Sequence, residues 1–143
     1  QKLTELGVDR IVPLAAARSV VRWEGPRAER AVARLRRVAL EAAAQCRRVW
    51  LPELYGVLGL DELDALDLGG LAFAEPGGGH LGEDVTAVAV GPEGGWAPEE
   101  LAAGGGRRTV VLGPHVLRAE TAAIAAGVLL CARRADTVCT GPR

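Results

Sequence analysis

Two glycine-containing segments hold the residues whose types and spacing best suit ligand binding. The first, residues 91–95, reads GPEGG and directly follows an apolar run. The second, residues 112–122, reads LGPHVLRAETA and follows another apolar run. A strand end followed by glycine is where an open α/β sheet holds its ligands, and glycine can adopt positive φ and approach a bound molecule closely. The glycines with this freedom are Gly91, Gly94, Gly95 and Gly113. Neither a P-loop nor a dinucleotide-binding pattern is present.

Together the two segments resemble the SPOUT-class methyltransferases. Within that class they are similar to the RsmE family, which methylates N3 of a uridine in bacterial small-subunit (16S) ribosomal RNA. Segments at residues 5–8, 11–14 and 41–48 agree with the family, so the resemblance covers nearly the whole chain. It implies an α/β fold with a mainly parallel sheet flanked by helices and a C-terminal trefoil knot. It also implies a homodimer through the C-terminal helix region and S-adenosylmethionine as cofactor.

The resemblance places the cofactor at three strand ends. The residues expected to bind S-adenosylmethionine are Ala74, Glu75, Pro76, Val90, Gly91, Pro92, Glu93, Gly94, Gly95, Leu112, Gly113, Val116, Leu117, Arg118 and Thr121. Backbone N–H and C=O groups of these loops suit the adenine edge. Leu112, Val116 and Leu117 suit its two faces, and they also read as ordinary core residues.

Methyl transfer to uridine N3 requires alignment, exclusion of water and loss of the N3 proton. Arg118 is the first choice for the catalytic cation that stabilises the developing negative charge, with an ion pair to Glu93 or Glu120 as the alternative. Glu120 is a candidate base, or a carboxylate that stabilises the start of the last helix. His115 stands where the family usually has arginine, and a neutral histidine does not replace a permanent cation.

Basic residues concentrate in the first third of the chain. Residues 1–48 contain eleven Lys/Arg and five Asp/Glu, whereas residues 49–105 contain eleven Asp/Glu and no Lys/Arg. This partition predicts a local anionic partner, with solvated helix faces as the equal alternative. By family position, the resemblance implies RNA contacts from Arg18, Arg22, Gln45 and Arg48. For Arg22 an exposed ion pair is the better alternative. Ala44 stands where the family usually has glutamate.

Hydrophobic periodicity predicts the elements that position these residues. Helices are expected at residues 1–6, 27–48, 60–68, 97–101 and 119–133, and strands at 10–15, 71–74, 86–90 and 108–112. Gly7 is expected to end the first helix in a left-handed conformation. Residues 77–82 are expected to form a mobile loop with His80 as an exposed bystander. The helix at 27–48 has an arginine stripe opposite its apolar face, which is either solvated or tracks a phosphate backbone. The last helix is apolar almost all round, which predicts a subunit interface.

The chain of 143 residues predicts one globular SPOUT domain over residues 1–143. It contains no methionine, so residue 1 is not expected to be the natural start. The PUA-like RNA-binding domain that precedes the family's catalytic domain is expected to be missing. Three cysteines without paired spacing predict no metal site and a cytoplasmic protein, and no apolar run predicts a membrane span. The alternative functions are a SPOUT ribose 2′-O-methyltransferase and a non-catalytic RNA-binding SPOUT domain.

Overall fold

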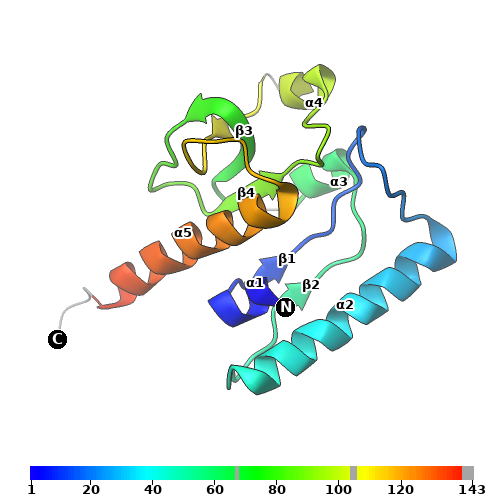
Figure 1. The fold of residues 1–143 in the computed structure, drawn as a ribbon, viewed down its shortest axis with the longest axis vertical. Helices are drawn as coiled ribbons and strands as arrows, with labels where there is room; N and C mark the ends of the chain where they lie inside the picture. The colour runs from blue at the N-terminus through cyan, green and yellow to red at the C-terminus, as the bar shows by residue number, and fades with distance from the viewer. Residues whose placement is uncertain (67, 104–105, 140–143) are drawn as a thin grey trace. The chain divides into compact units, whose positions relative to one another are not determined.

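The computed structural model describes residues 1–66, 68–103 and 106–139 (Figure 1), and side chains of the last helix up to residue 134. The chain divides into two compact units, Gln1–Leu66 (unit 1) and Asp67–Arg143 (unit 2). Each unit contains its own small sheet, and every strand pair in the described ranges is parallel. The predicted α/β class with parallel strands is therefore confirmed. The trefoil knot and the single-domain organisation stay predictions.

Unit 1 is built around a β-α-β crossover. Strands β1 (Arg10–Ile11) and β2 (Glu53–Leu54) pair in parallel, joined through helix α2 (Gly25–Gln45). The predicted strand at residues 10–15 continues beyond β1 only as separate bonds, from Leu58 N to Pro13 O at 3.0 Å and from Ala15 N to Leu58 O at 2.8 Å. Proline has no N–H, so the ladder is interrupted at Pro13. Strand β2 was not predicted from the sequence.

The helix ends of unit 1 follow local signals. Helix α1 (Lys2–Leu6) ends at Gly7 with φ of 95°, as predicted. Helix α2 begins two residues earlier than predicted because Pro26 suits a first helical turn. It ends at Gln45, because Cys46 caps it and Arg47 has φ of 58°. Helix α3 (Leu60–Asp64) is shorter than the predicted 60–68, and residue 67 lies outside the described residues.

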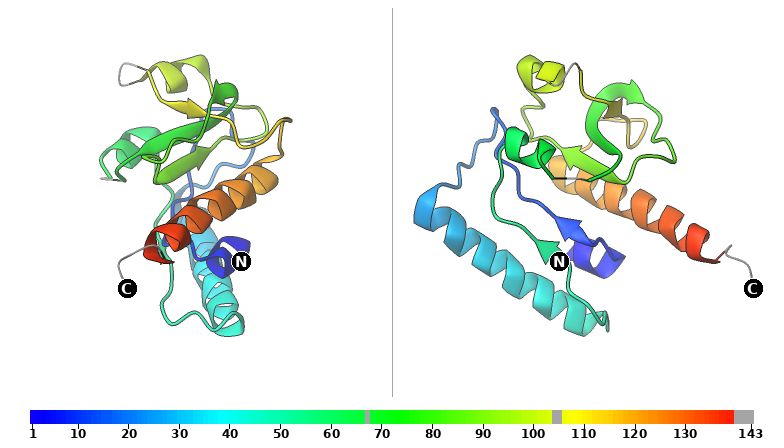
Figure 2. Two further views of the ribbon diagram at one scale, coloured as in Figure 1. Left: turned by 90° about the vertical axis from the view of Figure 1, so that its left-hand side faces the viewer. Right: turned by 180° about the vertical axis from the view of Figure 1, so that it is seen from behind.

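Unit 2 contains a three-stranded parallel sheet in the order β4-β3-β5. Its strands are β3 (Leu71–Gly79), β4 (Ala87–Val90) and β5 (Thr109–Val110). The short helix α4 (Pro98–Ala102) lies between β4 and β5, and α5 (Ala119–Cys139) packs along β4 (Figures 1 and 2). The core of the sheet is formed by Ala72, Val85 and Val110, with Leu81, Val88 and Leu130 packed against them.

Strand β3 differs from the prediction of a short strand followed by a mobile loop. It extends to Gly79 and curves strongly (Figure 1). Val110 pairs with both Ala74 and Gly79, so residues 75–78 bulge out of the ladder. A Cβ at Gly78 would lie 2.7 Å from Val110 N, and only glycine allows this approach. The loop prediction is wrong for residues 77–79, whereas His80 is exposed as predicted.

Candidate functional site

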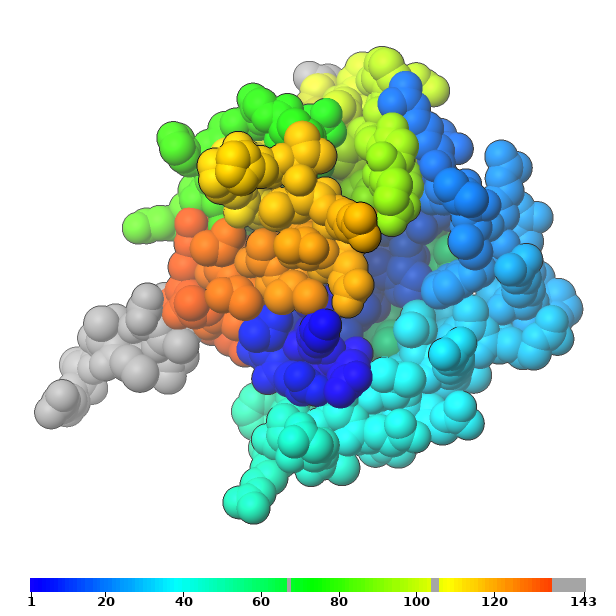
Figure 3. Space-filling view, in the orientation of Figure 1, coloured from blue at the N-terminus to red at the C-terminus, as the bar shows by residue number. Residues whose placement is uncertain are grey.

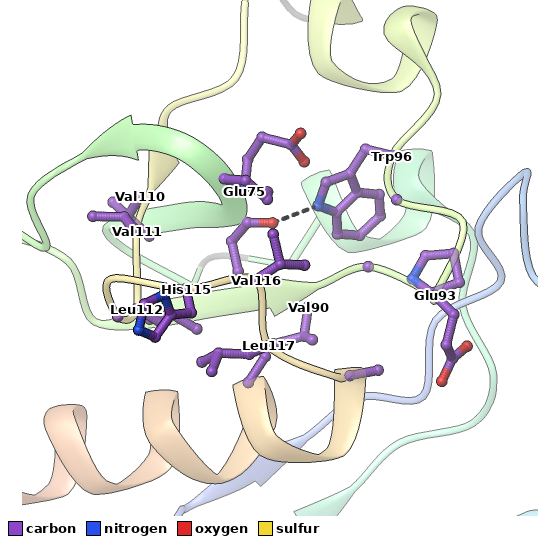
Figure 4. A pocket seen from close by; sticks show the side chains of 18 residues that line it. Glu75, Val90, Glu93, Trp96, Val110, Val111, Leu112, His115, Val116 and Leu117 are labelled. Atoms are coloured by element: carbon purple, nitrogen blue, oxygen red, sulfur yellow. Dashed lines mark hydrogen bonds between the residues drawn. The ribbon is translucent and has the colours of Figure 1, made fainter.

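A pocket lies in unit 2 where the three parallel strands reach their carboxyl ends (Figure 4). Strand β3 contributes residues 74–76, β4 leads into the GPEGG loop, and β5 leads into residues 111–117. The pocket has a volume of about 130 Å³. Its lining residues are Ala74, Glu75, Pro76, Val90, Gly91, Pro92, Glu93, Gly95, Trp96, Val110, Val111, Leu112, Gly113, His115, Val116, Leu117, Ala119 and Ala122.

Trp96 organises one wall of this pocket. Its side chain is buried, and its indole Nε1–H donates to the Ala74 carbonyl at 3.1 Å, the dashed line in Figure 4. A Cβ at Gly91 would lie 3.0 Å from the indole ring, so glycine there makes room for Trp96. Of the four glycines in the two loop segments, Gly95 adopts positive φ, at 69°, whereas Gly91, Gly94 and Gly113 do not.

Phe73 supports Trp96 from behind the pocket. The two rings meet edge to face, with centroids 4.9 Å apart and planes inclined by 63°. The Arg107 guanidinium lies 4.6 Å from the Phe73 ring centroid, a cation–π contact. Arg107 Nε also donates to the Glu100 carbonyl of α4 at 2.8 Å. This stack fixes the indole plane that faces the pocket.

Most residues predicted to bind the cofactor come together in the pocket lining. Gly94, Arg118 and Thr121 do not line it. The prediction missed lining residues that include Trp96, Val110 and Ala122. Trp96 directly follows GPEGG in the sequence. A large apolar residue beside a glycine loop is the pattern from which its place in the pocket lining could have been predicted. Val110 and Ala122 are buried and carry no polar group, so the sequence marks them only as core.

Neither of the two candidate catalytic residues lines the pocket. Arg118 is exposed, and its neighbours Leu117 and Ala119 both line the pocket. Within the described ranges, Arg118 forms no ion pair with Glu93 or Glu120, so the predicted alternative of such a pair is not found. Glu120 is exposed in the first turn of α5. His115 belongs to the lining itself.

The residues predicted to contact RNA all belong to unit 1. Arg18, Arg22 and Gln45 are exposed. Arg48 is different, because its side chain is only 8% exposed and pairs with Asp9 at 3.2 Å. Its Nη1 donates to the carbonyls of Thr4 at 3.1 Å and Val8 at 2.9 Å. The structure therefore gives Arg48 structural contacts near the end of α1, and its RNA contact stays a prediction.

Two arginines contact the segments at the amino ends of β4 and β5, whereas the pocket lies at the carboxyl ends of the strands. Arg108 forms an ion pair with Asp84, and its hydrogen bond lowers the pKa of the Asp84 carboxyl and raises that of Arg108. Arg133 of α5 donates to the carbonyls of Leu81 at 2.6 Å and Gly82 at 2.7 Å. These contacts fix residues 81–84, which precede β4. None of the residues that form them lines the pocket.

Two further features bear on the class of protein. No helix in the described part of the chain has the length and apolarity needed to cross a bilayer. No group of three or more His, Cys, Asp or Glu side chains is placed to hold a metal ion among the residues that the structure describes.

Comparisons with known proteins agree with this geometry. A family model for an RNA methyltransferase domain matches residues 1–130. "Ribosomal RNA small subunit methyltransferase E" from Mycobacterium bovis and from Mycobacterium tuberculosis are each 38% identical over 138 residues, covering 86% of this chain and 53% of theirs. A Neisseria gonorrhoeae structure of the same enzyme bound to S-adenosyl methionine has a TM-score of 0.79 and 32% identity, covering 90% of this chain and 57% of that one.

The chain spans about half the length of the curated relatives it matches. The family model covers most of the chain, and the two relatives exceed 30% identity over most of it. The chain therefore belongs to the RNA methyltransferase domain family of the RsmE type.

Proposed function

We propose that this chain carries the methyl-transfer site of an enzyme that methylates N3 of a uridine in 16S ribosomal RNA, with S-adenosylmethionine as methyl donor. The observation that carries the proposal is the pocket at the carboxyl ends of β3, β4 and β5, built from GPEGG and residues 111–117. A family member from Neisseria gonorrhoeae has been solved with S-adenosyl methionine bound.

The residues that line the pocket fit this cofactor. Val90, Leu112 and Leu117 offer apolar contacts for a flat base, and the glycine loops offer backbone donors and acceptors. Glu75 and Glu93 add negative charge, which favours a ligand with a sulfonium and an ammonium group. The volume is below the ~300–1000 Å³ of most ligand pockets, so the pocket would enclose only part of the cofactor. Val116, 80% exposed, is one of the lining residues.

The cofactor supplies an activated methyl group, and the chain's own residues align and polarise the acceptor. Arg118 is permanently charged and exposed, and it follows the lining residue Leu117. These features support a role for Arg118 in stabilising the negative charge that a uracil oxygen gains as N3 loses its proton. Glu120, two residues further on, is the proposed base, and its other possible role is to stabilise the start of α5. Glu120→Gln distinguishes the two, because loss of a base changes the pH profile of kcat.

A homodimer through α5 is part of the proposal. Val128 and Leu129 are 44% and 37% exposed on this helix, although both side chains are apolar. Covering them with a second copy would remove this surface from water. The ribosomal RNA substrate also favours a cytoplasmic protein.

Calorimetric titration with S-adenosylmethionine, followed by identification of the methylated nucleoside, tests the proposal. We expect saturable binding near one cofactor per chain and 3-methyluridine in 16S rRNA. Gly91→Ala should weaken cofactor binding about tenfold, because its Cβ pushes Trp96 into the pocket. Gly56→Ala is the matched control, since a Cβ there meets nothing within 4 Å.

Two outcomes would contradict the proposal. A 2′-O-methylated nucleoside would identify a ribose methyltransferase instead. A folded protein that binds RNA but not the cofactor would identify a non-catalytic RNA-binding domain.

A further inference from the structure

A groove in unit 1 is lined by residues of helix α2 and by Trp23, which precedes the helix. The groove, called the α2 groove below, is lined by Trp23, Arg27, Arg30, Ala31, Arg34, Leu35 and Val38. Its residues combine three exposed cations with an apolar floor and one half-buried indole. The space-filling view shows α2 as blue to cyan spheres (Figure 3). None of these residues lines the pocket of unit 2. The three arginines belong to the arginine stripe of this helix, for which the sequence left a solvated face and a phosphate contact as alternatives.

The arginines of the α2 groove differ from the other arginines of the same helix. Within the described residues, the side chains of Arg27, Arg30 and Arg34 take part in no hydrogen bond or ion pair. By contrast, Arg36 donates to the Leu54 carbonyl at 3.2 Å, and Arg37 lies 4.0 Å from Glu41. Arg27, Arg30 and Arg34 are spaced by three and four positions, and like charges at these spacings destabilise a helix slightly. Their repulsion therefore lowers the stability of α2 unless an anion neutralises it.

The charges and shape of the α2 groove suit a single-stranded polyanion with flat bases. Arg27 and Arg34 are seven positions apart, about 10 Å along the helix axis. The three cations therefore suit an extended chain of negative charges better than a single anion. Guanidinium groups bind phosphate through paired donors. Trp23 at the groove offers an indole for stacking, and Ala31, Leu35 and Val38 offer apolar contacts.

We infer that the α2 groove binds a single-stranded segment of RNA, with phosphates on Arg27, Arg30 and Arg34 and a base on Trp23. The inference rests on the proposed function, because the substrate RNA supplies the polyanion. An acidic peptide would satisfy the arginines, but it has no bases to use the indole and the apolar floor. RNA therefore accounts for all the lining residues.

Fluorescence anisotropy with a short labelled oligouridine, over a range of salt concentrations, tests the inference on the whole chain. Arg30→Gln should weaken binding and reduce the slope of log K against log salt by about 0.7, and the triple change of Arg27, Arg30 and Arg34 to Gln by about 2. Trp23→Leu should weaken binding about tenfold and leave the slope unchanged. Arg37→Gln is the matched control, because it removes one exposed charge from α2 outside the groove.

The results separate failure of this inference from failure of the proposed function. If Arg30→Gln behaves like Arg37→Gln and Trp23→Leu binds normally, the α2 groove is not the RNA site, although cofactor binding and methylation stand. If no cofactor binds but the groove variants still lose RNA affinity, the groove inference holds and the enzyme proposal fails. If the triple variant keeps RNA and loses polyglutamate, an acidic protein is the partner and the inference is overturned. Circular dichroism checks that each variant is folded.

Discussion

Arg47 is a non-glycine residue in a glycine-type position. Among the described residues it is the only one other than glycine with positive φ, at 58°. It follows the Cys46 cap of α2, and the next residue, Arg48, donates its backbone N–H to the Ala43 carbonyl at 2.9 Å. This bond pattern is a Schellman motif, in which glycine is the favoured residue after the cap. The strain places Arg48 where it bonds the end of α1.

Replacing Arg47 with glycine should therefore stabilise the protein. Relief of the left-handed conformation is worth about 1 kcal/mol after the added freedom of the unfolded chain is subtracted. Urea denaturation monitored by circular dichroism measures the free energy of unfolding. Ala44→Gly, inside the last turn of α2, is the control and should lower it by about 0.5–1 kcal/mol. A destabilised Arg47→Gly variant would show that the arginine side chain matters more than the backbone strain.

At the scale of elements, the ion pair between Asp84 and Arg108 joins the segments that lead into β4 and β5. A Cβ at Gly82 would lie within 2.6 Å of both side chains, so glycine lets the pair close over the backbone. Arg133 of α5 holds the carbonyls of Leu81 and Gly82 from the other side. Because β4 continues into GPEGG, these contacts help to set the register that positions the pocket.

This pair predicts a loss of stability in acid. The hydrogen bond from Arg108 lowers the pKa of Asp84 in the folded state. The contribution is therefore present above the unfolded pKa, near 3.9, and is lost as pH falls through the lower folded value. Asp84→Asn should be less stable than the wild type near neutral pH, and the difference should shrink below about pH 4. Thermal unfolding across this pH range measures it; a difference independent of pH would exclude the ion pair as its source.

At the scale of the whole molecule, the exposed apolar positions of α5 determine whether two chains associate. Leu129→Glu should shift the protein to a monomer, because a buried unpaired carboxylate in a subunit interface is costly. Light scattering after size-exclusion chromatography measures the mass. Val20→Glu, at an 88% exposed position in unit 1, is the control with the same kind of change and should leave the mass unaltered. A wild type that is monomeric at all concentrations would contradict the homodimer.

Local patterns in the sequence predicted much of the fold. The periodicity of α2 placed its apolar residues correctly, since Val32, Ala39, Ala42 and Ala43 are buried. The apolar runs before GPEGG and LGPHVLRAETA predicted parallel strands ending at a ligand-binding edge, and both loops line the pocket. Gly7 ended α1 as expected. Such features depend on residues close together in the chain, so composition and spacing are sufficient to predict them.

Contacts between distant residues were decided only by the tertiary structure. Trp96 became a pocket wall because its indole reaches back to the Ala74 carbonyl, and that contact explains Gly91 better than backbone freedom does. Arg48 has structural contacts because Thr4 and Val8, some forty positions earlier in the chain, offer their carbonyls. The bulge in β3 depends on the close approach of Gly78 to Val110. The sequence by itself thus determined most of the elements and the location of the pocket. Packing between elements decided the extent of β3, the pairing of β2 and what individual side chains contact.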